Sequence, residues 1–185
     1  MMISGDNFQN GIQRGDGDYY FSKIPHTWGW ATWRRAWKEF DFDMKDFPDF
    51  LKNKLIEEIW DDKKIQKYWL ERFGDVYTKR LDAWDYQFAY AIWKNNGICI
   101  SPNVNLVSNI GFGAGASNTF NNSDALANIP AKSIRLPLTH PKEMVVNKTA
   151  DDRDNHTRMK YESIKRFFKQ IGLFNYVRNI YREYL

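Results

Sequence analysis

Cysteine is almost absent from the sequence. Its single cysteine, Cys99, excludes an internal disulfide and a zinc site built from several cysteines, and it suits a reducing compartment. The three histidines, His26, His140 and His156, do not follow the spacing of zinc ligands. They also form no Ser-His-Asp or Cys-His pattern, so the sequence does not predict a hydrolase of those types.

Long apolar runs are also missing. No stretch approaches the ~20 apolar residues that a membrane-spanning helix needs. The N-terminus has neither the basic nor the apolar region of a signal peptide. We therefore expect a cytoplasmic protein, in which the Asn-x-Ser/Thr triplets at Asn121, Asn147 and Asn155 are chance matches.

The chain lacks a strong charge of one sign. Its 27 Lys and Arg residues and 23 Asp and Glu residues give a net charge of +4. The basic residues are spread out except at the C-terminus, whereas a nucleic-acid groove needs a concentrated basic face. This pattern argues against nucleic acid and favours a small anionic ligand or a membrane surface. With 43% hydrophobic and 17% aromatic residues, the 185 residues predict a globular domain.

Tryptophan is abundant, and four of the eight tryptophans lie within residues 25–37. Trp30, Trp33 and Trp37 have the i, i+3, i+7 spacing of one helical face, which predicts a turn leading into a helix. The bias of large aromatics toward burial favours a core position for Trp33 and Trp37.

The start of this run is open to two interpretations. His26, Trp28 and Trp30 either pack in the core or line a cleft in which flat rings stack on a sugar or a base. Arg34 follows closely, and a guanidinium group can pair with phosphate oxygens.

The remaining pattern predicts an α/β fold with mixed short strands and flanking helices. In the best-defined helix, Asp82 is expected to be the N-cap, Asp85 to occupy N3, and Gly97 to end the helix. We expect strands at residues 1–8, 19–21, 98–100 and 104–107 and helices at 51–60, 62–73 and 82–97.

Few residues are candidates for chemistry. Asp85 either caps its own helix or accepts a proton, because the helix dipole favours a negative charge there. Gly111 and Gly113 belong to a small-residue loop that is either a mobile substrate loop or a plain connection. The two Asp-x-Asp triplets, at 16–18 and 41–43, follow no apolar strand and read as solvated turns rather than metal sites.

Residues 1–145 resemble the C-terminal part of bacterial nucleotide-diphospho-sugar transferases, family 2-like glycosyltransferases of the GT-A fold often labelled hemolytic-protein-like. The matching motifs are Ile3-Ser4-Gly5-Asp6-Asn7, the run Pro25-His26-Thr27-Trp28-Gly29-Trp30-Ala31-Thr32-Trp33, Trp84-Asp85, Pro102-Asn103 and Val107-Ser108-Asn109-Ile110-Gly111.

The resemblance implies a nucleotide-sugar donor, a glycan or lipid-linked acceptor, and a divalent metal, Mn or Mg. Asp85 would match the carboxylate that deprotonates the acceptor hydroxyl, and His140 would help to hold the metal or the diphosphate. The implied substrate-binding residues are His26, Trp28, Trp30, Arg34, Trp84, Asn109, Gly111 and Gly113.

In such enzymes the nucleotide-binding half and a metal-binding Asp-x-Asp strand precede the strand that begins this chain. We therefore expect residues 1–150 to be the acceptor-side part of a GT-A domain, with little or no transferase activity alone. Residues 151–185 are expected to form a C-terminal tail. A non-catalytic carbohydrate-binding or assembly module remains the alternative.

Residues 159–185 predict a basic, aromatic amphipathic helix, in which Tyr161 and Phe167 lie on the apolar face. Such a helix either contacts an anionic membrane at its inner face or docks on the domain's own core. A peripheral membrane adaptor organised around this helix is therefore a third interpretation.

Overall fold

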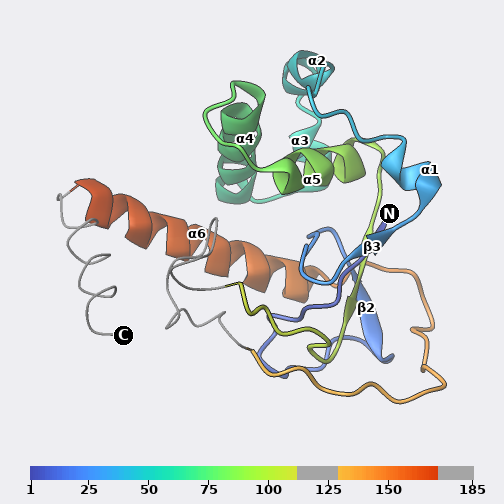
Figure 1. Cartoon of the computed structure of the whole chain (residues 1–185). Coiled ribbons are helices and arrows are strands. Elements are labelled where there is room, and N and C mark those ends of the chain that lie inside the picture. Colours follow the sequence, from blue (N-terminus) through green and yellow to red (C-terminus); the bar gives the residue numbers. More distant parts are fainter. Residues whose placement is uncertain (112–128, 171–185) are drawn as a thin grey trace.

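The computed structural model describes residues 1–111 and 129–170, and it confirms a mixed α/β fold (Figure 1). A small sheet lies beneath a layer of helices. The strands are β1 Met2–Ile3, β2 Tyr19–Ser22, β3 Ala31–Thr32 and β4 Cys99–Pro102. The helices are α1 Arg34–Trp37, α2 Phe47–Lys52, α3 Ile56–Ile59, α4 Lys63–Tyr77, α5 Trp84–Lys94 and α6 Lys148–Gln170.

The four strands form one mixed sheet in the order β2-β4-β1-β3. β1 pairs parallel to β4 and antiparallel to β3, while β2 pairs antiparallel to β4 at the opposite edge. The strand predicted at residues 19–21 is confirmed, and it lies at an edge of the sheet. The N-terminal strand has neighbours on both sides, and it runs for only two residues before the chain turns.

The strand predicted at residues 104–107 is wrong. This segment runs beside the chain that follows β1, and it is held there by a side-chain amide together with a backbone hydrogen bond. The Asn7 backbone N–H donates to Asn105 Oδ1 (3.1 Å), and the Leu106 N–H donates to the Gly5 carbonyl (2.8 Å). Asparagine competes in this way with backbone pairing, which explains why an apolar run failed to form a strand.

The helices α2 to α5 enclose an aromatic core. Trp69 and Phe73 of α4 meet Trp93 of α5 at ring-centroid distances of 4.5 and 5.5 Å. The single helix predicted at 51–60 is instead two short helices, because Lys54 between them adopts a positive φ of 54°. A left-handed residue cannot continue a right-handed helix.

Helix α4 begins as predicted, since the Asp62 carboxylate accepts hydrogen bonds from Lys64 N (2.6 Å) and Ile65 N (3.3 Å). The predicted cap of α5 is wrong. Ala83 is the N-cap and provides no side-chain bond, so Asp82 lies before the helix and Asp85 lies in its first turn. The side chain of Asp82 is exposed.

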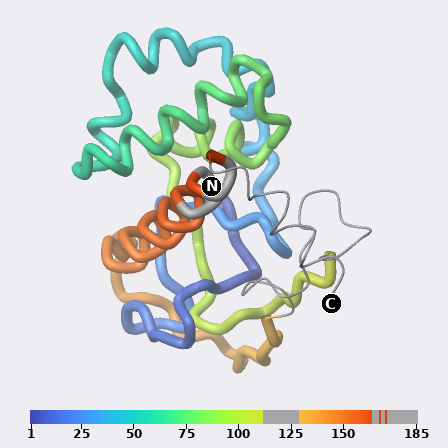
Figure 2. Tube along the Cα trace, turned by 90° about the vertical axis from the view of Figure 1, so that its left-hand side faces the viewer, coloured from blue at the N-terminus to red at the C-terminus, as the bar shows by residue number. Residues whose placement is uncertain are grey.

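Helix α6 starts at Lys148, which places it across the predicted boundary between residues 150 and 151. It lies below the helical layer and beside the strands (Figures 1 and 2), and its side chains bond to α4 and to β2. Its first turns are buried, so this part of the predicted tail is docked on the domain. Within the residues that the structure describes, no helix is long and apolar enough to cross a membrane.

Candidate functional site

The tryptophan run forms a tight turn held by glycines. Gly29 has a φ of +61°, and a Cβ added there would lie 2.4 Å from Val107 Cγ1. A Cβ at Gly5 would meet the Gly29 carbonyl oxygen at 2.7 Å. The two glycines therefore let the Trp28–Trp30 turn pack directly on the end of β1. This contact fixes the backbone positions from which the side chains of Trp28 and Trp30 extend.

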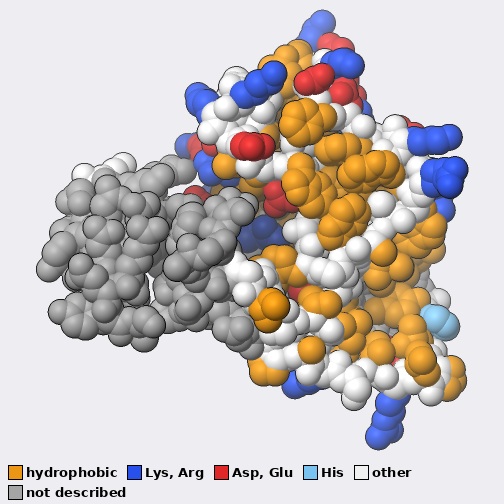
Figure 3. All heavy atoms as spheres, viewed as in Figure 1, with side chains coloured by type: hydrophobic (Ala, Val, Ile, Leu, Met, Phe, Trp, Pro, Cys, Tyr) orange, Lys and Arg blue, Asp and Glu red, His pale blue; other side chains and the backbone are white. Residues whose placement is uncertain are grey.

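Trp30 belongs to a cluster of partly exposed rings, which we call the aromatic platform: Trp30, Trp37, Phe40 and Trp84. The Trp30 ring lies 5.2 Å from Trp84 and 5.9 Å from Trp37, and Trp37 stacks on Phe40 at 4.8 Å. Buried Phe88 of α5 supports it from below. Figure 3 shows hydrophobic side chains gathered over the face that carries α5.

The core positions predicted for Trp33 and Trp37 are wrong, because their side chains are 37% and 43% exposed. The reason is the length of α1, which has only four residues. Trp30 precedes β3 and Trp33 is the N-cap of α1, so the predicted helical face does not form. Trp33 instead carries the Arg35 guanidinium over its ring at 5.1 Å.

Asp85 lies in the first turn of α5, directly after Trp84 of the platform. Its carboxylate is half-buried and makes no side-chain hydrogen bond or ion pair with the part of the chain that the structure describes. The positive end of the helix dipole favours a negative charge at this position. Asp85 thus directly follows a platform residue in the sequence, and its oxygens have no partner among the described residues.

His26 does not line a cleft, because its side chain is only 3% exposed. Its Nε2 lies 3.0 Å from Asp154 Oδ2, and its Nδ1 lies 3.3 Å from an Arg158 nitrogen. Gln9 Nε2 donates to the other Asp154 oxygen (2.7 Å), and the Phe8 ring packs on the imidazole at 4.9 Å. Helix α6 thus covers His26 and gives it a structural role under the Trp28 turn.

Asp6 is a buried acidic residue within the motif Ile3-Ser4-Gly5-Asp6-Asn7, and no functional role was predicted for it. Burial raises its pKa, while nearby His26 and a hydrogen bond from the Trp28 backbone act to lower it. Its Oδ1 has no hydrogen-bond partner in the part of the chain that the structure describes. The one feature of the sequence that could have marked Asp6 as a candidate site residue is its position just after an apolar strand. Polar side chains often gather at that edge of a sheet.

The other predicted site residues that the structure describes belong to three different segments of the chain. Arg34 is exposed on α1, close to the platform in sequence. Asn109 Oδ1 accepts a hydrogen bond from Gly111 N (2.8 Å), which makes a local turn, and Gly113 lies outside the described residues. His140 is exposed, and its Nδ1 lies 3.0 Å from the Tyr19 hydroxyl.

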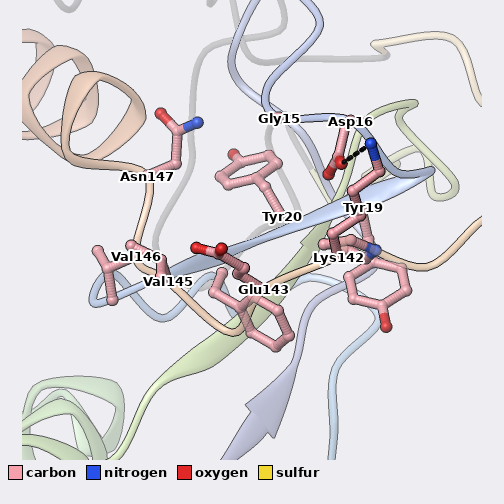
Figure 4. Close-up of a pocket in the computed structure, with 11 residues that line it drawn as sticks. Gly15, Asp16, Tyr19, Tyr20, Lys142, Glu143, Val145, Val146 and Asn147 are labelled. Atoms are coloured by element: carbon pink, nitrogen blue, oxygen red, sulfur yellow. Dashed lines mark ion pairs between the residues drawn. The ribbon is translucent and has the colours of Figure 1, made fainter.

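A pocket of about 370 Å³ lies along β2, at the sheet edge opposite β3 (Figure 4). It includes Asp16, whose carboxylate lies 3.9 Å from Lys142 Nζ. Asp18 of the same triplet accepts a hydrogen bond from Thr139 N (2.6 Å). These carboxylates hold the 139–142 segment against the turn, which explains the triplet without a metal.

A second pocket, of about 230 Å³, lies at the N-terminal end of α5 and includes Asp82 and Ala83. It adjoins Trp84 and Asp85 in the chain, whereas the pocket along β2 includes none of the predicted site residues. The candidate site is therefore the aromatic platform with Asp85.

No family profile, curated protein or solved structure matches this chain.

Proposed function

We propose that the chain forms the acceptor side of a GT-A-type glycosyltransferase, in which the aromatic platform binds the acceptor sugar and Asp85 takes its proton. The observation that carries the proposal is the half-buried Asp85 carboxylate, which follows exposed Trp84 in the sequence and has no side-chain partner among residues 1–111 and 129–170. Aromatic faces stack on the apolar face of a sugar ring, and a carboxylate binds its hydroxyls.

The transfer would proceed at the acceptor hydroxyl. Its oxygen forms a bond to the anomeric carbon of the nucleotide-sugar donor, and the bond from that carbon to the nucleoside diphosphate breaks. The hydroxyl proton goes to Asp85. Exposed Arg34 could pair with the anionic leaving group through its guanidinium.

The family resemblance also implies a Mn or Mg ion, and the described residues do not fit one. Across residues 1–111 and 129–170, no group of three or more His, Cys, Asp or Glu side chains is placed to hold a metal. His140 is bonded to a tyrosine hydroxyl rather than grouped with carboxylates. We therefore assign no step of the reaction to a metal.

A non-catalytic carbohydrate-binding module is the second candidate, because stacking rings provide sugar affinity without any proton transfer. Asp85→Asn separates the two functions. In a preparation that transfers sugar, loss of a general base lowers kcat by about 10²–10⁴-fold and leaves acceptor binding intact. An unchanged rate in Asp85→Asn would remove Asp85 from the chemistry.

Saccharide binding tests the platform directly. Trp84→Ala should weaken the binding of a β-glucoside such as cellobiose about 3–10-fold, measured by calorimetry or by ligand-observed NMR. Trp33→Ala is the matched control, because Trp33 has a similar exposure and lies outside the platform. Equal losses in both variants, or no saccharide binding to the wild-type chain, would contradict the proposal.

A further inference from the structure

The pocket at the N-terminal end of α5, which we call the α5 pocket, is built from three connected segments. It has a volume of about 230 Å³, and it is lined by Phe42, Asp43, Val76, Tyr77, Lys79, Leu81, Asp82, Ala83 and Gln87. Asp82 and Ala83 directly precede Trp84 and Asp85. The pocket is therefore continuous along the chain with the proposed acceptor site.

Two aromatic side chains form its apolar walls. Phe42 is 56% exposed, and Tyr77 is exposed at the end of α4. Phe40 of the platform and Phe42 of the pocket are two residues apart, so one segment contributes a ring to each. Gln87 Nε2 donates to the Phe42 carbonyl (2.6 Å), which ties this segment to α5 one helical turn after Ala83.

The opposite wall is the connection between α4 and α5, which is held by its own backbone. Lys79 adopts a positive φ of 59°, and the N–H groups of Arg80 and Leu81 both donate to the Asp75 carbonyl, at 2.8 and 3.1 Å. The wall is thus ordered by local hydrogen bonds. A pocket with walls fixed in this way is largely formed before a ligand arrives.

Three charged side chains border the pocket: Asp43, Lys79 and Asp82. None of them makes an ion pair or a side-chain hydrogen bond with the residues described in the structure. Ala83 takes the N-cap position of α5, so the expected capping carboxylate of Asp82 lies before the helix and is exposed to solvent. Two carboxylates and one ammonium group give the pocket a net negative charge.

We propose that the α5 pocket binds the second sugar of the acceptor, and that it selects a neutral or amino sugar over an anionic one. This inference rests on the proposed function. The volume is below the ~300 Å³ of most drug-sized ligand sites, so it suits one sugar ring rather than a nucleotide. Rings with nearby carboxylates bind sugar hydroxyls or an amino group, while the net charge disfavours a uronic acid.

The test compares cellobiose, the β-linked glucosamine dimer and digalacturonate with methyl β-glucoside, which fills the platform alone. Phe42→Ala should weaken binding of the two favoured disaccharides about 3–10-fold and leave methyl β-glucoside unchanged. Asp82→Asn should weaken binding of the glucosamine dimer more than binding of the other probes. It should also reduce the difference in affinity between digalacturonate and cellobiose. Leu51→Ala and Asp49→Asn, at exposed positions of α2, are the matched controls.

The outcomes separate the two proposals. If Trp84→Ala weakens every saccharide while Phe42→Ala and Asp82→Asn match their controls, the pocket inference is wrong and the acceptor platform stands. Tighter binding of digalacturonate than of cellobiose to the wild-type chain would overturn the charge argument. If the wild-type chain binds none of the four probes, both proposals fail.

Discussion

At the scale of single residues, the placement of the tryptophans depends on Gly29. Its φ of +61° is strained for any residue with a Cβ, and Val107 Cγ1 fills the space in which that Cβ would lie. Trp28 and Trp30 leave the backbone on either side of it. One backbone position therefore decides whether the platform can form.

Gly29→Ala should destabilise the protein by about 2–4 kcal/mol, because left-handed strain and a steric clash act together. Urea denaturation measures the free energy of unfolding. Gly74→Ala is the control, since Gly74 is in α4 and, apart from the backbone of its own helix, no atom of the described residues would lie close to an added Cβ. That variant should stabilise by about 0.5–1 kcal/mol.

A second variant separates the two causes. Adding Val107→Ala to Gly29→Ala removes the atom that clashes most closely and should recover part of the loss in stability. The strained φ would account for the rest. If Gly29→Ala unfolds like the wild-type protein, the contact between Gly29 and Val107 is not a constraint on the turn.

The role of a residue was predictable where its neighbours in the sequence decide it. The prediction failed where a distant element decides it. The start of α4 was predicted at about residue 62, and its cap is local, since Asp62 accepts hydrogen bonds from Lys64 N and Ile65 N. His26 is buried because Asp154, 128 residues later, pairs with it. Asp82 does not have the capping role expected of it, because the N-cap of α5 is the next residue, Ala83.

At the scale of elements, α6 is attached to the sheet by Asp151. Its carboxylate accepts hydrogen bonds from Ser22 Oγ (2.6 Å) and Lys23 N (3.0 Å) at the end of β2. Burial, reinforced by nearby Asp154, raises the pKa of Asp151 to about 6. The folded state therefore binds this proton more tightly than the unfolded state does.

This raised pKa predicts a pH dependence of stability. The contribution of Asp151 is full below its usual pKa of about 4 and is lost as pH rises through about 6. The stability difference between the wild type and Asp151→Asn should fall by up to about 3 kcal/mol from pH 4 to pH 7. Urea denaturation at several pH values measures it.

Asp152→Asn provides the control for this titration. Asp152 is the next residue of α6, and it is half-buried rather than buried. The stability difference between the wild type and Asp152→Asn should change little over the same pH range. A difference for Asp151→Asn that is flat, or that grows toward pH 7, would contradict the raised pKa.

Elements were predictable where apolar periodicity marks the buried face, as in α4 and α5. Apolar periodicity did not mark the packed face of α6, because that face is largely polar. Asp151, Asp154, Asn155 and Arg158 follow helical spacing, and each contacts the rest of the fold. Hydrophobic periodicity cannot detect a helix that docks through hydrogen bonds and ion pairs.

At the scale of the whole molecule, α6 connects the helical layer to the strands. Asp151 bonds to β2, Asp154 pairs with the turn that carries Trp28, and Asn155 reaches α4. The mixed α/β class was predictable from the strand and helix patterns. The connection made by α6 was not predictable, because it joins residues that lie more than eighty positions apart in the sequence.

The bond between Asn155 and Trp69 makes this connection testable. Asn155 Oδ1 accepts the indole N–H of Trp69 at 2.8 Å, and both side chains are fully buried. Asn155→Ala leaves that donor unsatisfied and should cost about 1–3 kcal/mol. Thr157→Ala, at an exposed position of the same helix, is the control.

Two probes follow the same thermal unfolding. Near-ultraviolet circular dichroism reports the tryptophan packing of the helical layer, and far-ultraviolet circular dichroism reports the backbone of the whole domain. If α6 couples the layers, both transitions of Asn155→Ala shift together to a lower temperature, because the fold unfolds as one unit. A near-ultraviolet transition that falls while the far-ultraviolet transition stays in place would mean that the two layers are stabilised independently.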